Sequence, residues 1–217
     1  MTKTFNQNYA EFNIPMEGRK AAIDAIEFPG DIYIFGVWSG VSTKLVSDYL
    51  QEQHIPYDRI LGFDSFIGLP EEDPALRHRE HTIGKYSSTG LYRKTIAETM
   101  NLIEEGVDDK KLTLFPGFYE KTLDAELIYT ENLGVASFVD IDVDLHGSTV
   151  EVLEFLFSGG LVAHGTTIYF DDWGATQEYK GGESLAWKQQ TEKYNIKYKE
   201  IHSSGEPPCT VKVFKIL

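Results

Sequence analysis

Two clusters of aspartate, each at the end of an apolar run, constrain this chain more than any other feature of its sequence. The runs begin at residues 136 and 166, and the carboxylates that close them are Asp140, Asp142, Asp144, Asp171 and Asp172. A short apolar run is typical of a parallel strand that is covered on both faces. Carboxylates at the carboxyl edge of such a sheet suit a divalent cation with oxygen ligands, usually Mg²⁺. The alternative is that they cap helices and face solvent.

Strand-like and helix-like runs alternate along the chain, which favours an α/β fold. The expected strands are residues 31–38, 59–64, 111–115, 136–142 and 166–171. The expected helices are residues 15–27, 41–53, 91–105, 148–157 and 182–194. Segments 196–202 and 210–217 alternate apolar and polar side chains, as an antiparallel pair at a sheet edge would. The sequence therefore predicts a mainly parallel sheet with helices on both faces and a terminal antiparallel hairpin.

Length and charge narrow the class of protein and of partner. The 217 residues fit one large domain. With 34 acidic and 20 basic side chains the formal charge is −14, so we expect a small-molecule substrate and neither nucleic acid nor a membrane surface as partner. The first residues lack the apolar stretch of a signal peptide, which predicts a soluble, cytoplasmic protein. The single cysteine, Cys209, agrees with a reducing compartment.

A second signal is the turn Phe35-Gly-Val-Trp-Ser-Gly-Val-Ser42, between the first expected strand and the helix after it. Glycine lets the backbone approach a ligand and a helix N-terminus offers unpaired N–H groups, so a nucleotide-like cofactor is expected there. Asp64 ends the second expected strand, where such folds hydrogen-bond the hydroxyls of a ribose. The alternatives are a purely steric need for the glycines and a capping role for Asp64, because the turn does not match G-x-G-x-x-G.

Five motifs extend this pattern in order along the chain. They are Phe35-Gly-Val-Trp-Ser-Gly, Gly62-Phe-Asp-Ser-Phe-Ile-Gly-Leu-Pro-Glu, Phe115-Pro-Gly-Phe-Tyr-Glu-Lys-Thr-Leu, Asp140-Ile-Asp-Val-Asp-Leu-His-Gly-Ser-Thr and Phe170-Asp-Asp-Trp. Together they resemble the macrocin O-methyltransferase family of class I S-adenosylmethionine-dependent methyltransferases. The resemblance implies a Rossmann-like sandwich with a mostly parallel seven-stranded sheet. It also implies S-adenosyl-L-methionine as methyl donor, Mg²⁺ beside the donor, and a sugar or glycosylated natural product as the acceptor.

The resemblance also assigns the candidate site by position. Gly36 and Gly40 would line the methionine end of the donor, Asp64 would bind its ribose, and Gly117 with Phe118 would lie near adenine. The full donor-binding set is Phe35, Gly36, Val37, Trp38, Gly40, Ser42, Asp64, Ser65, Gly117, Phe118 and Asp142. The metal set is Asp142, Asp171 and Asp172, although the spacing between the two clusters is slightly longer than the family pattern.

Two further departures from the family pattern concern polar side chains. Ile34 stands where the family has an acidic residue, so one polar contact to the donor is missing or supplied elsewhere. His146 and Gly147 replace two polar residues on the substrate side, which points to an atypical acceptor. Methyl transfer to a hydroxyl needs a base, and His146 is the preferred candidate because imidazole titrates near neutral pH; Asp142 and Asp144 are the alternatives.

The organisation of the chain and two other functions complete the expectations. Residues 1–29 are expected to form a helical extension, residues 30–217 the methyltransferase domain, and residues 70–92 a lid over the acceptor site. We expect a homo-oligomer. Asp142-Val-Asp144 also matches the Asp-x-Asp of metal-dependent glycosyltransferases. The departures at Ile34 and His146 leave open a donor-binding protein without turnover.

Overall fold

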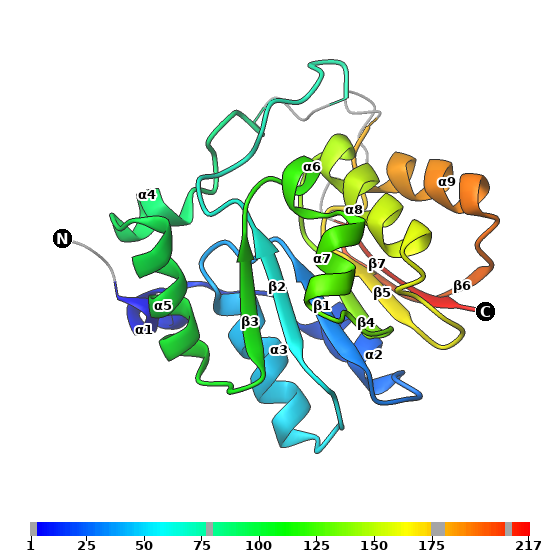
Figure 1. The fold of residues 1–217 in the computed structure, drawn as a ribbon, viewed down its shortest axis with the longest axis horizontal. Coiled ribbons are helices and arrows are strands. Elements are labelled where there is room, and N and C mark those ends of the chain that lie inside the picture. Colours follow the sequence, from blue (N-terminus) through cyan, green and yellow to red (C-terminus); the bar gives the residue numbers. More distant parts are fainter. Residues whose placement is uncertain (1–3, 77–79, 175–180, 207–209) are drawn as a thin grey trace.

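A seven-stranded sheet with the order β3-β2-β1-β4-β5-β7-β6 forms the centre of the computed structural model, which describes residues 4–76, 80–174, 181–206 and 210–217 (Figure 1). The strands are β1 (Asp31–Phe35), β2 (Ile60–Asp64), β3 (Leu112–Pro116), β4 (Ala136–Ile141), β5 (Thr167–Phe170), β6 (Tyr198–Ser204) and β7 (Val211–Ile216). The first five strands are parallel, and β7 pairs antiparallel with both β5 and β6. The predicted mostly parallel sheet with a terminal antiparallel hairpin is confirmed.

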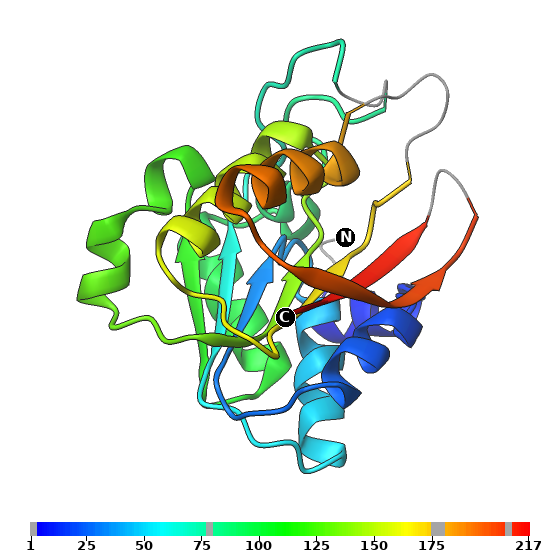
Figure 2. The same ribbon diagram turned by 90° about the vertical axis from the view of Figure 1, so that its right-hand side faces the viewer.

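Helices cover both faces of this sheet, and Figure 2 shows the orange and yellow helices on the opposite side from the blue ones. One face carries α1 (Phe5–Glu11), α2 (Glu17–Asp24), α3 (Val41–Glu52) and α5 (Ile96–Val107). The other face carries α6 (Tyr119–Thr122), α7 (Ala125–Thr130), α8 (His146–Ser158) and α9 (Glu183–Tyr194). The short helix α4 (Ser88–Tyr92) precedes α5. Within the described residues, no helix is both long and apolar enough to cross a membrane.

Alternate side chains of each central strand build two separate cores. In β1, Tyr33 and Phe35 pack toward α8 and α9, whereas Ile32 and Ile34 pack toward α2, α3 and α5. This follows from the two-residue period of a strand, and all four side chains are fully buried. The continuous apolar run of β1 is therefore explained by cover on both faces.

Local signals account for most differences from the expected boundaries. The expected helix 91–105 is divided because Arg93 takes a left-handed conformation with φ 52°, and a capping box of Thr95 and Glu98 then starts α5. The helix expected over residues 15–27 is shorter and spans Glu17–Asp24. Helices α1, α6 and α7 are short and had no strong apolar period to indicate them.

Candidate active site

A cavity of about 570 Å³ opens beside the carboxyl ends of the parallel strands, and described residues of the segment between β2 and α4 form part of its wall. This volume is in the usual range for a site that binds a small molecule. Most of the residues expected to bind the donor or the metal line it, and so does the candidate base Asp144. The donor and metal residues are Gly36, Trp38, Ser42, Asp64, Ser65, Gly117, Phe118, Asp142, Asp171 and Asp172. Motifs that are far apart in the sequence therefore meet at one cavity.

Four residues of the expected site lie outside this lining. Phe35 and Val37 are buried in the two cores, and Gly40 caps the start of α3 with φ 78°. His146 is the first residue of α8, and its Nε2 lies 2.8 Å from Oε1 of Gln189 on α9. The structure thus directs the imidazole toward α9, and its role as the base stays a prediction.

The glycine turn after β1 brings the backbone of two strands into close contact. Gly36 has φ +91°, and a Cβ atom there would lie 1.8 Å from the carbonyl oxygen of Asp142. The N–H of Gly36 donates to the carbonyl of Phe63, and the N–H of Asp142 donates to the carbonyl of Phe35, each over 3.0 Å. Only glycine fits this position, so the turn needs its first glycine for close approach.

Asp64 connects three turns at the carboxyl edge of the sheet. Its Oδ2 accepts the N–H of Trp38 at 2.8 Å, and its Oδ1 accepts the N–H of Phe66 at 2.6 Å. Its backbone carbonyl accepts the N–H of Gly117 at 2.9 Å. Burial raises the pKa of Asp64, although the N–H bonds from Trp38 and Phe66 oppose that shift. The carboxylate is therefore fixed in place at the cavity wall.

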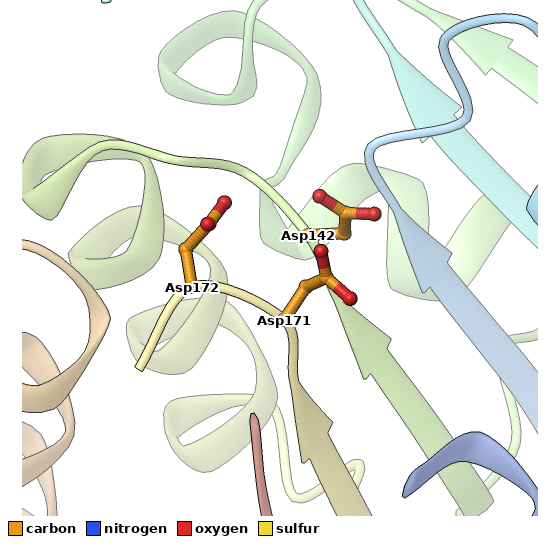
Figure 3. Close-up of side chains that lie close together, drawn as sticks. All are labelled: Asp142, Asp171 and Asp172. Atoms are coloured by element: carbon orange, nitrogen blue, oxygen red, sulfur yellow. The ribbon is translucent and has the colours of Figure 1, made fainter. Parts of the chain in front are cut away.

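Three aspartates of the two acidic clusters converge on one point of the cavity. Asp142, Asp171 and Asp172 each offer a carboxylate oxygen, and these atoms lie within 4.8 Å of one another. Figure 3 shows Asp142 just after β4, with Asp171 and Asp172 on the segment that follows β5. Burial and the neighbouring charge of Asp171 raise the pKa of Asp142 well above its usual range. An all-oxygen, strongly anionic set of this kind fits Mg²⁺.

Arg19 of α2 lies against the same cluster and was not expected from the sequence. Its side chain is only 1% exposed, and its guanidinium bonds Asp140 at 2.7 Å, Asp142 at 2.9 Å and Asp171 at 3.1 Å. Burial opposes the charge of Arg19, but these carboxylates and Tyr169 outweigh it and raise its pKa. A usable signal was present, because Arg19 shares the helical face of the buried Ala22 and Ile23.

The segment between β2 and α4 contributes polar side chains to the cavity wall. Nε2 of His81 lies 3.3 Å from Oδ1 of Asp144, and both residues line the cavity. Oε2 of Glu72 accepts the N–H of Gly147 at 2.6 Å, which joins this segment to the first turn of α8. His78 and Cys209 lie outside the described residues.

The strand order, the close glycine turn and the position of Asp64 define a class I methyltransferase fold. Two solved structures share this fold, although each has only 18% sequence identity. The O-methyltransferase NovP gives a TM-score of 0.66 over 91% of this chain and 78% of its own. The calicheamicin methyltransferase CalS11 gives 0.63 over 97% of this chain and 89% of its own.

The sequence comparison identifies the family within this class. A family profile described as Macrocin-O-methyltransferase (TylF) matches residues 16–199, so the chain belongs to the macrocin O-methyltransferase family. A relative from Streptomyces olivaceus, 8-demethyl-8-(2,3-dimethoxy-alpha-L-rhamnosyl)-tetracenomycin-C 4'-O-methyltransferase, is 24% identical over 160 residues. The match covers 70% of this chain and 59% of that relative. The resemblance inferred from the five motifs is therefore confirmed.

Proposed function

We propose that the protein is a Mg²⁺-dependent O-methyltransferase that transfers the methyl group of S-adenosylmethionine to a hydroxyl of a sugar or a glycosylated natural product. The observation that supports this most is the convergence of Gly36 and Asp64 with Asp142, Asp171 and Asp172 at one cavity. Membership of the family and the rhamnosyl acceptor named for the Streptomyces olivaceus relative support the acceptor class. The expected cytoplasmic location and homo-oligomeric state stay predictions.

The donor side of the cavity is assigned to the turn after β1 and to the ends of β2 and β3. Asp64 would accept hydrogen bonds from the two ribose hydroxyls, since both of its oxygens are held at the cavity wall. Gly117 and Phe118 follow β3 and would border the adenine ring. Ile34 is fully buried beside α2 and α3 and does not line the cavity, so donor contacts here come from other residues.

The acceptor side is assigned to the acidic cluster. Asp142, Asp171 and Asp172 would hold the cation, which when bound lowers the pKa of a coordinated hydroxyl and fixes its oxygen. Asp144 lies two residues beyond Asp142, lines the cavity and contacts His81, and this position supports the carboxylate as the acceptor of the hydroxyl proton. His81 would orient the carboxylate, and the segment that carries it would exclude water.

The proposal is tested by measuring transfer of a labelled methyl group from S-adenosylmethionine to a panel of glycosides, with Mg²⁺ and with excess chelator. Methylation of a sugar hydroxyl that is lost in chelator is the expected result. Calorimetric titrations with S-adenosylmethionine and with sugar nucleotides separate the alternatives. Tight binding of a sugar nucleotide would favour the glycosyltransferase, and donor binding with no acceptor turned over would favour a binding protein.

The affinity for S-adenosylmethionine is expected to depend on the charge of Asp64. Because the ionised carboxylate is the better acceptor for ribose hydroxyls, lowering the pH should weaken donor binding. Burial raises the pKa of Asp64, so this loss should begin at a higher pH than the ordinary aspartate value of 3.8 implies. The measurement is the donor Kd between about pH 4 and pH 8. Asp64→Asn should bind weakly and lack this step; a step retained in the variant would assign the titration to another group.

A further inference from the structure

Arg19 bonds the acidic cluster from the side of the sheet that carries α2. Nε donates to Oδ2 of Asp140, Nη2 donates to Oδ2 of Asp142, and Nη1 donates to Oδ1 of Asp171. Nη1 also donates to the hydroxyl of Tyr169 at 3.0 Å, and the guanidinium carbon lies 4.3 Å from the centre of that ring. The three nitrogens of one side chain thus contact three carboxylates from β4 and from the end of β5.

We propose that Arg19 is a positioning residue that holds Asp142 and Asp171 in the orientation required to bind a single divalent cation. The guanidinium uses one oxygen of each carboxylate, so the second oxygen of each is left for the side of the cavity. The guanidinium also places a fixed positive charge on the side of the cluster that faces α2. This inference rests on the proposed metal dependence and adds a residue that the metal set does not contain.

Geometry explains why arginine and not lysine would serve this purpose. A guanidinium is planar and presents its N–H groups in a fixed fork, whereas an ammonium group is a single point of charge. Lysine at position 19 would keep the charge but could not contact three separate carboxylates in the same arrangement. The carboxylates would then be free to rotate, because the guanidinium N–H groups that hold each of them in one orientation against their mutual repulsion would be missing.

If Arg19 only attached α2 to the sheet, its substitution would not change the affinity for the cation. Arg59 provides a matched control for this possibility. Arg59 donates to both oxygens of the buried Asp31, at 3.0 and 2.6 Å, at the opposite edge of the sheet from the cavity. Arg59→Lys removes the same kind of fork from an ion pair of the same kind. Its expected effect is confined to stability.

The experiment is a titration of the full-length chain with Mn²⁺, in which electron paramagnetic resonance reports the free ion. The wild-type chain should bind one Mn²⁺. Arg19→Lys should raise the Mn²⁺ Kd roughly 10–100-fold, as loss of a residue that orients metal ligands typically does. Arg59→Lys should leave the Kd unchanged. A Kd for Arg19→Lys within about twofold of wild type, or an equal increase in both lysine variants, would overturn the inference.

Asp140→Asn keeps the test decisive if Arg19→Lys does not fold. Asn has the shape of the native side chain, and Asp140 is not among the three aspartates that meet at the cavity. The variant weakens the hold on Nε of Arg19, so the Mn²⁺ Kd should rise severalfold; an unchanged Kd would contradict the inference. Absence of Mn²⁺ binding by the wild-type chain would overturn the metal dependence and this inference together. Wild-type binding with no effect of the variants would overturn this inference alone.

Discussion

Asp142→Asn is expected to lower methyl transfer at least about a thousandfold while changing the affinity for S-adenosylmethionine much less. The carboxylate of Asp142 belongs to the proposed metal set, and its backbone carbonyl lies against Gly36. The substitution would remove one anionic ligand of the proposed cation but keep the backbone and the side-chain volume. Loss of several kcal/mol of stabilisation by a bound cation corresponds to a decrease in rate of this size.

The measurement for Asp142→Asn is kcat with saturating Mg²⁺, together with the donor Kd by calorimetry. Asp109→Asn is a suitable control, because Asp109 accepts hydrogen bonds from Ser47 and Tyr57 and does not line the cavity. The control should lose stability and keep its Mg²⁺ requirement. Equal activity of wild type in Mg²⁺ and in excess chelator would contradict the role of the cation.

Asp144→Asn is expected to lower kcat by roughly 10²–10⁴, the usual contribution of a general base. The carboxylate lines the cavity next to Asp142 and contacts Nε2 of His81 at 3.3 Å. An amide cannot accept the proton, although it has the same shape. The pH–rate profile of the variant should lose its ascending limb, since that limb reports ionisation of the base.

His146→Ala distinguishes the two candidate bases. Its imidazole contacts Gln189 on α9 and does not line the cavity, so the substitution should change kcat by less than about threefold if Asp144 accepts the proton. A larger loss in His146→Ala than in Asp144→Asn would support the prediction made from the sequence. It would also require the side chain to turn from α9 toward the acceptor during catalysis.

The fold followed from the sequence because its signals are local. The apolar run of β1 predicted a buried strand, and the alternating pattern of the last two segments predicted an antiparallel hairpin; both are confirmed. Of the two hairpin strands only β6 is an edge strand, because β7 lies between β5 and β6 and is mostly buried. The convergence of Asp142 with Asp171 and Asp172 could also be predicted from the sequence. Parallel neighbouring strands place their carboxyl ends together, and β4 pairs with β5.

The arrangement around these strand ends depends on tertiary packing, which the sequence does not show directly. Arg19 reaches the cluster only because α2 packs across β4, β5 and β7. The direction of His146 depends on where α8 begins. The helix was expected from about residue 148, which left His146 in a loop, whereas the helix starts at His146 and turns the imidazole toward α9. The contact of His81 with Asp144 likewise depends on the path of a long segment.

Arg19 lies N-terminal to every strand of the sheet, and this position has a practical consequence. The residue that carries the positive charge, Arg19, lies on α2, which precedes β1 in the sequence. Limited proteolysis that trims the chain just beyond residue 19 would keep the sequence of every strand and remove that charge. In a fragment of this kind Asp140, Asp142 and Asp171 would lose the guanidinium that they share, so the repulsion among these carboxylates would no longer be offset by it.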